Sequence, residues 1–192
     1  MKVSMSQVGK SDVLAGALNG QRMLTKLLEL TRKEPQSPEL IFLDFSSVDV
    51  ATASFLREAV LAYRDTVRRR RSNFYPVVAN ANQVIEDELK ILVTAEGDAL
   101  MLCFLDKNDQ PRTPRLLGQL DPKQRLTFEL VQQRNDTNAA ELMREHGENE
   151  RVNQNAWNNR LASLANLGLV VELSEGRSKR YRPLLAGATY GN

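Results

Sequence analysis

Short amide side chains and a basic turn lie close together near the end of the chain, and their types suit recognition better than catalysis. On a helical projection of residues 153–166, one face carries Asn155, Asn158, Asn159 and Ala162. An asparagine amide both donates and accepts hydrogen bonds, so it can read an adenine edge or hold a phosphate. A small alanine on the same face allows close approach. These residues therefore indicate contact with a nucleic acid.

The opposite face of this expected helix is apolar. Trp157, Leu161 and Leu164 fall there and are expected to pack against the rest of the protein. Asparagine has a mediocre helix propensity, so a helix that retains several of them favours a role for their amides. The alternative is a helix whose outer face is merely polar.

A basic hairpin is expected directly after this helix. Gly168 suits the left-handed position that ends a helix, and residues 169–173 form an apolar run of strand length. Residues 174–182 hold four basic side chains and one acidic one, a local charge of +3. Such a cluster attracts phosphates. An ordinary charged hairpin tip is the alternative. The residues expected to contact phosphates are Arg177, Ser178, Lys179 and Arg180.

Other residues capable of chemistry do not form a convincing site. His146 reads as a helix-end residue and Cys103, in an apolar run, as a buried thiol. The acidic cluster 86–88 has no histidine nearby in sequence, and consecutive helical residues splay around the axis. The sequence contains no phosphate-binding glycine loop and no zinc-ligand spacing. We therefore expect no catalytic residues, no metal site and no cofactor, and a protein that is not an enzyme.

A run of four arginines, 68–71, lies at the expected C-terminal end of a helix. Cations there complement the helix dipole and aid solubility, which is the favoured interpretation. Contact with nucleic acid is the alternative.

The first half of the chain alternates strands and helices. Apolar runs at 40–46, 73–79 and 99–106 have strand length, and helical periodicity covers 11–33, 54–71 and 83–96. This order predicts an α/β domain, a small sheet covered by helices, over residues 1–106. Residues 107–120 contain two prolines and many polar side chains and read as a linker, although Leu116 and Leu117 could dock on a neighbour.

The last third is predicted to be a separate α+β domain, residues 121–192. Asp121 and Pro122 form a strong helix start, and a second short helix is expected from Thr137 to a point before Gly147. The following turn, 145–152, is then long and charged for a connection between two helices.

Composition limits the location and partners of the chain. One cysteine in 192 residues suits a reducing compartment, and no apolar stretch approaches the length of a membrane helix, so we expect a cytoplasmic protein without membrane contact. Residues 1–106 hold 13 basic and 14 acidic side chains, whereas residues 107–192 hold 13 and 10. This modest basic excess predicts moderate affinity for nucleic acid per subunit, which homodimerisation would increase.

The C-terminal part resembles the winged helix-turn-helix superfamily of bacterial transcription regulators. The resemblance spans residues 116–185 and rests on Asn159-Arg160-Leu161, Leu164, the segment 167–170 and Tyr181. It implies that the third helix enters a DNA groove while the wing contacts the backbone or the minor groove.

The N-terminal part resembles a STAS-like domain family, relatives of sulfate-transporter and anti-sigma-factor-antagonist domains. The match rests on the segments 43–48, 54–58 and 80–82 and spans residues 9–106. In the antagonist relatives a serine or threonine at a helix start is phosphorylated and switches partner binding, which here implicates Thr52 or Ser54. A simple helix cap is the favoured interpretation of both residues.

Together these features predict a transcriptional regulator that binds double-stranded DNA, with an N-terminal domain that senses a signal, binds a protein partner or self-associates. A protein-interaction switch without DNA binding, possessing two docking domains and regulated by phosphorylation, is the alternative. RNA binding also remains open, because the same amides can serve it.

Overall fold

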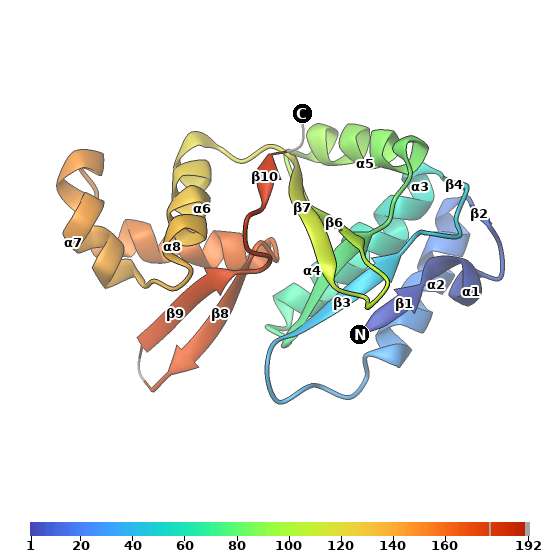
Figure 1. The fold of residues 1–192 in the computed structure, drawn as a ribbon, viewed down its shortest axis with the longest axis horizontal. Coiled ribbons are helices and arrows are strands. Elements are labelled where there is room, and N and C mark those ends of the chain that lie inside the picture. Colours follow the sequence, from blue (N-terminus) through green and yellow to red (C-terminus); the bar gives the residue numbers. More distant parts are fainter. Residues whose placement is uncertain (177, 191–192) are drawn as a thin grey trace.

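A six-stranded sheet forms the centre of the molecule in the computed structural model, which describes residues 1–176 and 178–190. The strand order is β1-β3-β5-β6-β7-β10 (Figure 1). The pairs β1–β3, β3–β5, β5–β6 and β7–β10 are parallel, and β6–β7 is antiparallel. The protein is therefore of the mixed α/β class. The strands are β1 (Lys2–Ser4), β3 (Glu39–Asp44), β5 (Phe74–Ala79), β6 (Ala99–Leu105), β7 (Pro111–Gly118) and β10 (Thr189–Tyr190).

Helices from the first half of the chain cover one face of this sheet, and their side chains share one core with it. Helix α5 begins and ends at residues suited to those positions: Asn82 caps it at its start, and Gly97 ends it with a φ of 62°. The helices are α1 (Met5–Gly9), α2 (Ala17–Leu30), α3 (Ala53–Leu56), the π-helical turn η1 (Arg57–Leu61), α4 (Ala62–Arg69) and α5 (Gln83–Glu96). A small parallel pair, β2 (Val13–Leu14) and β4 (Val50–Ala51), lies beside them.

The other face of the sheet packs against the C-terminal part of the chain. Side chains alternate across each strand, so Ile41 and Leu43 join the first core while Phe42 joins a second one. This second core also contains Trp157 and Leu164. The sheet is thus buried on both faces, and the last third of the chain supplies part of its cover.

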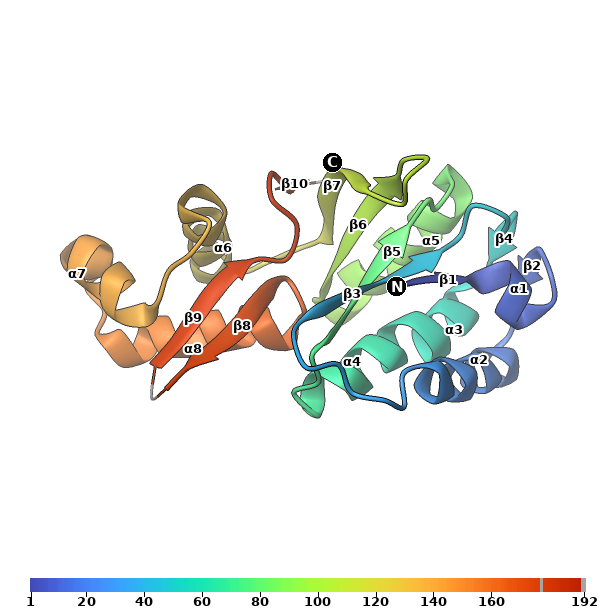
Figure 2. The same ribbon diagram turned by 60° about the horizontal axis from the view of Figure 1, so that its bottom comes forward.

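Three helices and a hairpin make up that C-terminal part (Figure 2). Asp121 accepts hydrogen bonds from the backbone amides of Lys123 and Gln124, and proline occupies the first turn, so the predicted helix start is confirmed. Thr137 and Tyr181 exchange two backbone hydrogen bonds and tie the hairpin to the turn between the first two helices. The elements are α6 (Pro122–Arg134), α7 (Ala139–Glu150), α8 (Gln154–Asn166), β8 (Val170–Glu175) and β9 (Ser178–Pro183).

The prediction of a linker at 107–120 is wrong for most of its length, because this segment contains β7. The strand pairs with β6 from Ala99↔Gly118 to Leu105↔Pro111, and Leu116 and Leu117 are buried on opposite faces of the sheet. Proline and polar residues are tolerated because part of this strand is exposed. After the hairpin the chain returns to pair β10 with β7. The sheet therefore includes residues from both predicted domains.

The prediction of a long turn at 145–152 is also wrong, because α7 continues through Gly147 to Glu150. Gly147 is buried, and a Cβ there would lie 2.4 Å from the Met143 sulfur, so the glycine allows close packing within the helix. Arg151 ends the helix with a φ of 51°. Only residues 151–153 separate α7 from α8, and His146 lies inside a helix instead of at its end.

Candidate nucleic-acid interface

Helix α8 has the two faces that the sequence predicts. Trp157, Leu161 and Leu164 are completely buried. Asn155, Asn158 and Asn159 are exposed, and Ala162 is half-buried. Asn153 caps the helix by accepting a hydrogen bond from the backbone amide of Ala156, so this asparagine has a structural role. The end of the helix is also as expected, since Gly168 has a φ of 73°.

The exposed face of α8 borders a groove of about 540 Å³, which we call the amide groove. The start of α7 and strand β9 form its other walls. Five of the residues predicted to bind nucleic acid line it, namely Asn158, Asn159, Ala162, Ser178 and Lys179. Asn155 is exposed but does not line the groove, and Arg177 lies outside the described residues. The remaining lining residues are Asn138, Ala139, Ala140, Gln154 and Tyr181.

Much of the predicted positive charge on the hairpin is paired inside the protein. Arg180 contacts Asp136, and its Nη1 lies 3.1 Å from Glu141 Oε1. Arg182 Nε lies 2.6 Å from the second oxygen of Asp136. Burial tends to raise the pKa of Asp136, but the hydrogen bonds from Arg182 and Arg180 outweigh it and hold that pKa below its usual value. Arg180 therefore anchors the hairpin to the helices instead of reaching freely outward.

Lys179 keeps more of its side chain in solvent, 45% exposed, although its ammonium lies 2.7 Å from Glu172 Oε1. An exposed ion pair of this kind is weak, so a phosphate could compete for the lysine. Tyr181, by contrast, is buried and donates a hydrogen bond to Glu172. Burial and the nearby Glu172 raise the pKa of Tyr181 well above the usual value, and its hydroxyl stays protonated.

A second groove of about 260 Å³ borders α8 on its C-terminal half, and we call it the arginine groove. Helix α4 supplies Arg68, the turn after it supplies Arg71, Ser72 and Asn73, and β5 supplies Tyr75. The hairpin supplies Glu172, Ser174 and Lys179. Helix α8 contributes Ala162, Ala165 and Asn166. Ala162 and Lys179 line both grooves, so the two are adjacent along the helix. The arginine run is plain in the sequence, but no local sequence signal places it beside α8.

Arg68 fixes that turn against α8. Its Nε donates to the carbonyl of Ala165 over 3.1 Å, and its Nη1 donates to the carbonyls of Ser72 and Phe74. The guanidinium also lies 3.9 Å from the ring centre of Tyr75. Arg68 is 5% exposed, so the first member of the arginine run is a buried structural residue.

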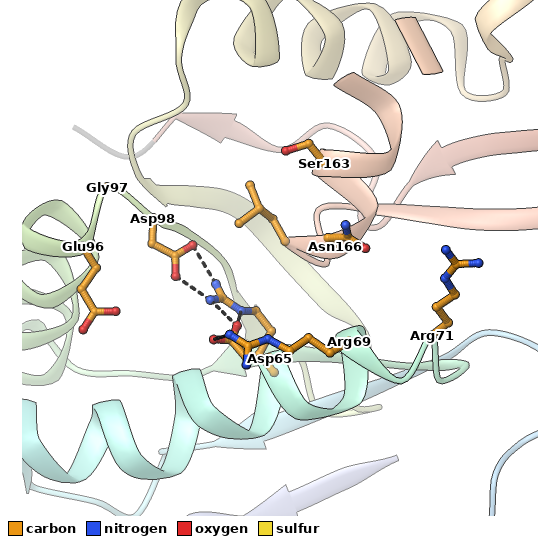
Figure 3. Close-up of a pocket in the computed structure, with 10 residues that line it drawn as sticks. Asp65, Arg69, Arg71, Glu96, Gly97, Asp98, Ser163 and Asn166 are labelled. Carbon is orange, nitrogen blue, oxygen red and sulfur yellow. Dashed lines mark hydrogen bonds and ion pairs between the residues drawn. The ribbon is translucent and has the colours of Figure 1, made fainter. Parts of the chain in front are cut away.

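A wider hollow of about 570 Å³ lies between α4, the end of α5 and the end of α8 (Figure 3). Its charges are largely balanced, because Arg64 binds Asp98 through two hydrogen bonds of 2.5 and 3.0 Å and also contacts Asp65. Arg69 and Arg71 stand at its rim opposite Asn166. The hollow therefore offers no concentrated charge of one sign for a small ligand.

Thr52 is the cap of α3, as favoured from sequence. Its hydroxyl oxygen accepts hydrogen bonds from the backbone amides of Phe55 and Gly16 and lies 3.2 Å from the Ser54 hydroxyl. Glu88 accepts a hydrogen bond from the backbone amide of Ala53 at the same helix start. A phosphate on Thr52 or Ser54 would meet this negative charge, which disfavours a phosphate bound there.

The other chemistry-capable residues have structural partners. Glu86 pairs with Arg115, and Asp87 accepts a hydrogen bond from Gln83, so the acidic cluster is dispersed. Within residues 1–176 and 178–190, no group of three or more His, Cys, Asp or Glu side chains is arranged to hold a metal ion. Cys103 is buried, and burial raises the pKa of its thiol to about 12, which keeps it protonated.

Comparisons of the chain with models of protein families and with curated protein sequences found no match. Among the helices of the described residues, none is long and apolar enough to cross a membrane.

Proposed function

We propose that the protein is a transcriptional regulator that binds double-stranded DNA. In this proposal α6, α7, α8 and the β8–β9 hairpin act as a winged helix-turn-helix unit, with α8 in the major groove and the hairpin against the backbone. The main support is the exposed amide face of α8, which lines a groove together with Lys179 while its apolar face is fully buried. Exposed amides with no apolar anchors suit a base edge better than a protein surface.

The chemistry divides between base contacts and phosphate contacts. Asn158 and Asn159 are proposed to read base edges, and each good bidentate contact contributes about 1–3 kcal/mol of discrimination against a wrong base. Lys179, Ser178 and Arg177 are proposed to contact phosphates, which adds affinity without sequence preference. Asn155, exposed one turn earlier than Asn159, would extend the contact surface along the helix.

The N-terminal part is proposed to be a STAS-like module that binds a protein partner or signal or forms a homodimer. Val13 and Val50 support a partner surface, because they pair in register in the small sheet and are 52% and 39% exposed. Regulation by phosphorylation has weaker support, since Thr52 already caps α3 and Glu88 lies at the same helix start.

Selection from random-sequence duplex DNA, followed by titration of the enriched duplex, tests DNA binding. The double variant Asn158→Ala/Asn159→Ala should lose about 2–6 kcal/mol of discrimination between the enriched and a scrambled duplex if both amides read bases. The control is Asn19→Ala, which removes an exposed asparagine from α2 and should leave discrimination unchanged.

Two results would contradict the proposal in different ways. Failure of the wild-type protein to bind or enrich any duplex would remove the DNA-binding function and favour the protein-interaction switch. Unchanged discrimination in the double asparagine variant would remove α8 as the element that reads bases. An enriched palindrome would in addition support homodimeric binding, because half-site symmetry mirrors protein symmetry.

A further inference from the structure

Helix α4, which ends in the arginine run, packs against α8, although 97 residues separate Arg68 from its partner Ala165 in sequence. Arg68 is buried and holds the turn to the carbonyl of Ala165, near the end of α8. Tyr75 strengthens this connection, because its hydroxyl accepts a hydrogen bond from the backbone amide of Glu172 in β8. The turn is therefore fixed in position against both α8 and the hairpin.

The next arginines are free to make contacts outside the protein. Arg70 and Arg71 are exposed. In the described part of the chain, the ion pairs of this run belong to Arg69, which lies 3.9 Å from Asp65, and neither Arg70 nor Arg71 has a carboxylate partner. This contrasts with Arg180 and Arg182 of the hairpin, which share Asp136.

The arginine groove has a net positive charge. Arg68, Arg71 and Lys179 line it. Two carboxylates oppose them: Glu172, which lines the groove, and Glu34, which accepts a hydrogen bond from the lining residue Ser72, so the balance is three positive charges against two negative. The groove also adjoins the amide groove through Ala162 and Lys179. A DNA phosphate backbone that runs along α8 out of the amide groove therefore lies next to Arg71.

The length of α8 suits this arrangement. At a rise of about 1.5 Å per residue, about 16 Å of helix separates Asn155 from Asn166, and the major groove is about 12 Å wide. A duplex whose bases lie against the first half of α8 therefore has one of its phosphate backbones near the second half of the helix. Asn166 and Arg71 stand at that end of the helix (Figure 3).

We propose that Arg70 and Arg71 of the α4–β5 turn bind the phosphate backbone of the same DNA duplex that α8 reads. The N-terminal α/β part is then a direct component of the DNA-binding surface, in addition to any role in partner binding. This inference rests on the proposed function and adds a surface to it. A fragment limited to α6–β9 should therefore bind DNA more weakly than the whole chain.

The variant Arg70→Ala/Arg71→Gly removes both charges with little effect on folding. Arg71 has a φ of 54°, a left-handed conformation that glycine adopts without strain, so this change leaves the turn intact. The matched control is Lys10→Gly/Arg22→Ala. Lys10 is likewise an exposed basic residue with a positive φ, 57°, and Arg22 is exposed on α2, so the control removes the same charge elsewhere.

Binding of each whole-chain variant to a labelled duplex is measured by fluorescence anisotropy at several salt concentrations. Each lost phosphate contact reduces the slope of log K against log salt by about 0.9, so two contacts reduce it by about 1.8 and weaken binding roughly 10- to 60-fold at about 0.1 M salt. The control should keep the wild-type slope. Thermal melting should show that both double variants remain folded.

The outcomes separate this inference from the proposed function. Wild-type affinity and slope in Arg70→Ala/Arg71→Gly, with binding still sensitive to Asn158 and Asn159, overturns the inference alone. An equal loss in the Lys10→Gly/Arg22→Ala control also overturns it, because net charge would then explain the effect. Absence of DNA binding by the wild-type protein overturns both.

Discussion

Replacing Arg68 with alanine should destabilise the protein much more than replacing its neighbour Arg69. Arg68 is 5% exposed and donates three hydrogen bonds to backbone carbonyls, whereas the Arg69 side chain is 82% exposed and has one contact at 3.9 Å. The two residues are adjacent in one helix and chemically identical. They therefore form an internal control for the effect of burial.

The expected magnitude follows from the contacts of Arg68. Three hydrogen bonds at about 1 kcal/mol each, plus about 1–2 kcal/mol for a desolvated contact with the Tyr75 ring, total about 4–5 kcal/mol. Truncation also ends the cost of keeping a charge buried, so we expect a net loss of about 3 kcal/mol. Arg69→Ala should change the free energy of unfolding by less than about 0.5 kcal/mol.

Urea denaturation measures the difference. With a denaturant dependence of about 2 kcal/mol per molar urea, Arg68→Ala should lower the midpoint by about 1.5 M, and Arg69→Ala should hardly move it. Arg68→Lys keeps the charge but loses the planar donor geometry, and it should fall between the two. Equal midpoints for Arg68→Ala and Arg69→Ala would refute the conclusion that Arg68 joins α4 to α8.

Two further predictions concern titratable groups. Because burial raises the thiol pKa of Cys103 to about 12, a disulfide reagent near pH 8 should label the native protein far more slowly than the urea-unfolded protein; equally fast labelling would contradict burial. This folded pKa exceeds the unfolded value of about 8.5, so the stability that the thiol contributes is lost as the pH rises from about 9 towards 12. Cys103→Ala should not show this pH-dependent loss. The pKa of Asp136 is lowered in the folded protein, so its contribution to stability is present above about pH 4 and lost on acidification. Asp136→Asn should therefore cost about 1 kcal/mol of stability near pH 7 and nothing at low pH. A destabilisation independent of pH would exclude the Asp136 ion pairs as its cause.

Features that depend on neighbouring residues could be predicted from the sequence. The bounds of α5 agree with the predicted helix at 83–96, because Asn82 and Gly97 mark its two ends locally. The two faces of α8 follow from helical periodicity alone, and the hairpin follows from the residues around its turn. For the same reason the sequence identified Asn158, Asn159 and Lys179 as members of one candidate surface.

Local properties also misled where a distant contact decided the structure. The prolines and polar residues of 107–120 favour a linker, but β6 offers an edge for pairing and the two sheet faces bury Leu116 and Leu117. Gly147 favours the end of a helix, but its close contact with Met143 suits the interior of α7. In both segments, burial outweighed local propensity.

Only the tertiary structure distinguishes the members of the arginine run and the charges of the hairpin. Arg68 is buried against Ala165, whereas Arg70 and Arg71 are exposed and Arg71 lines a groove with Ala162 and Asn166 of α8. Arg180 is paired with Asp136, which is 44 residues away in the sequence. Helix caps and periodicity act over a few residues, so the sequence by itself determined most of the helices, the hairpin and the polar face of α8, but not β7 or the end of α7. Contacts between distant segments depend on how those elements pack, and that packing decided which charges are available to a partner.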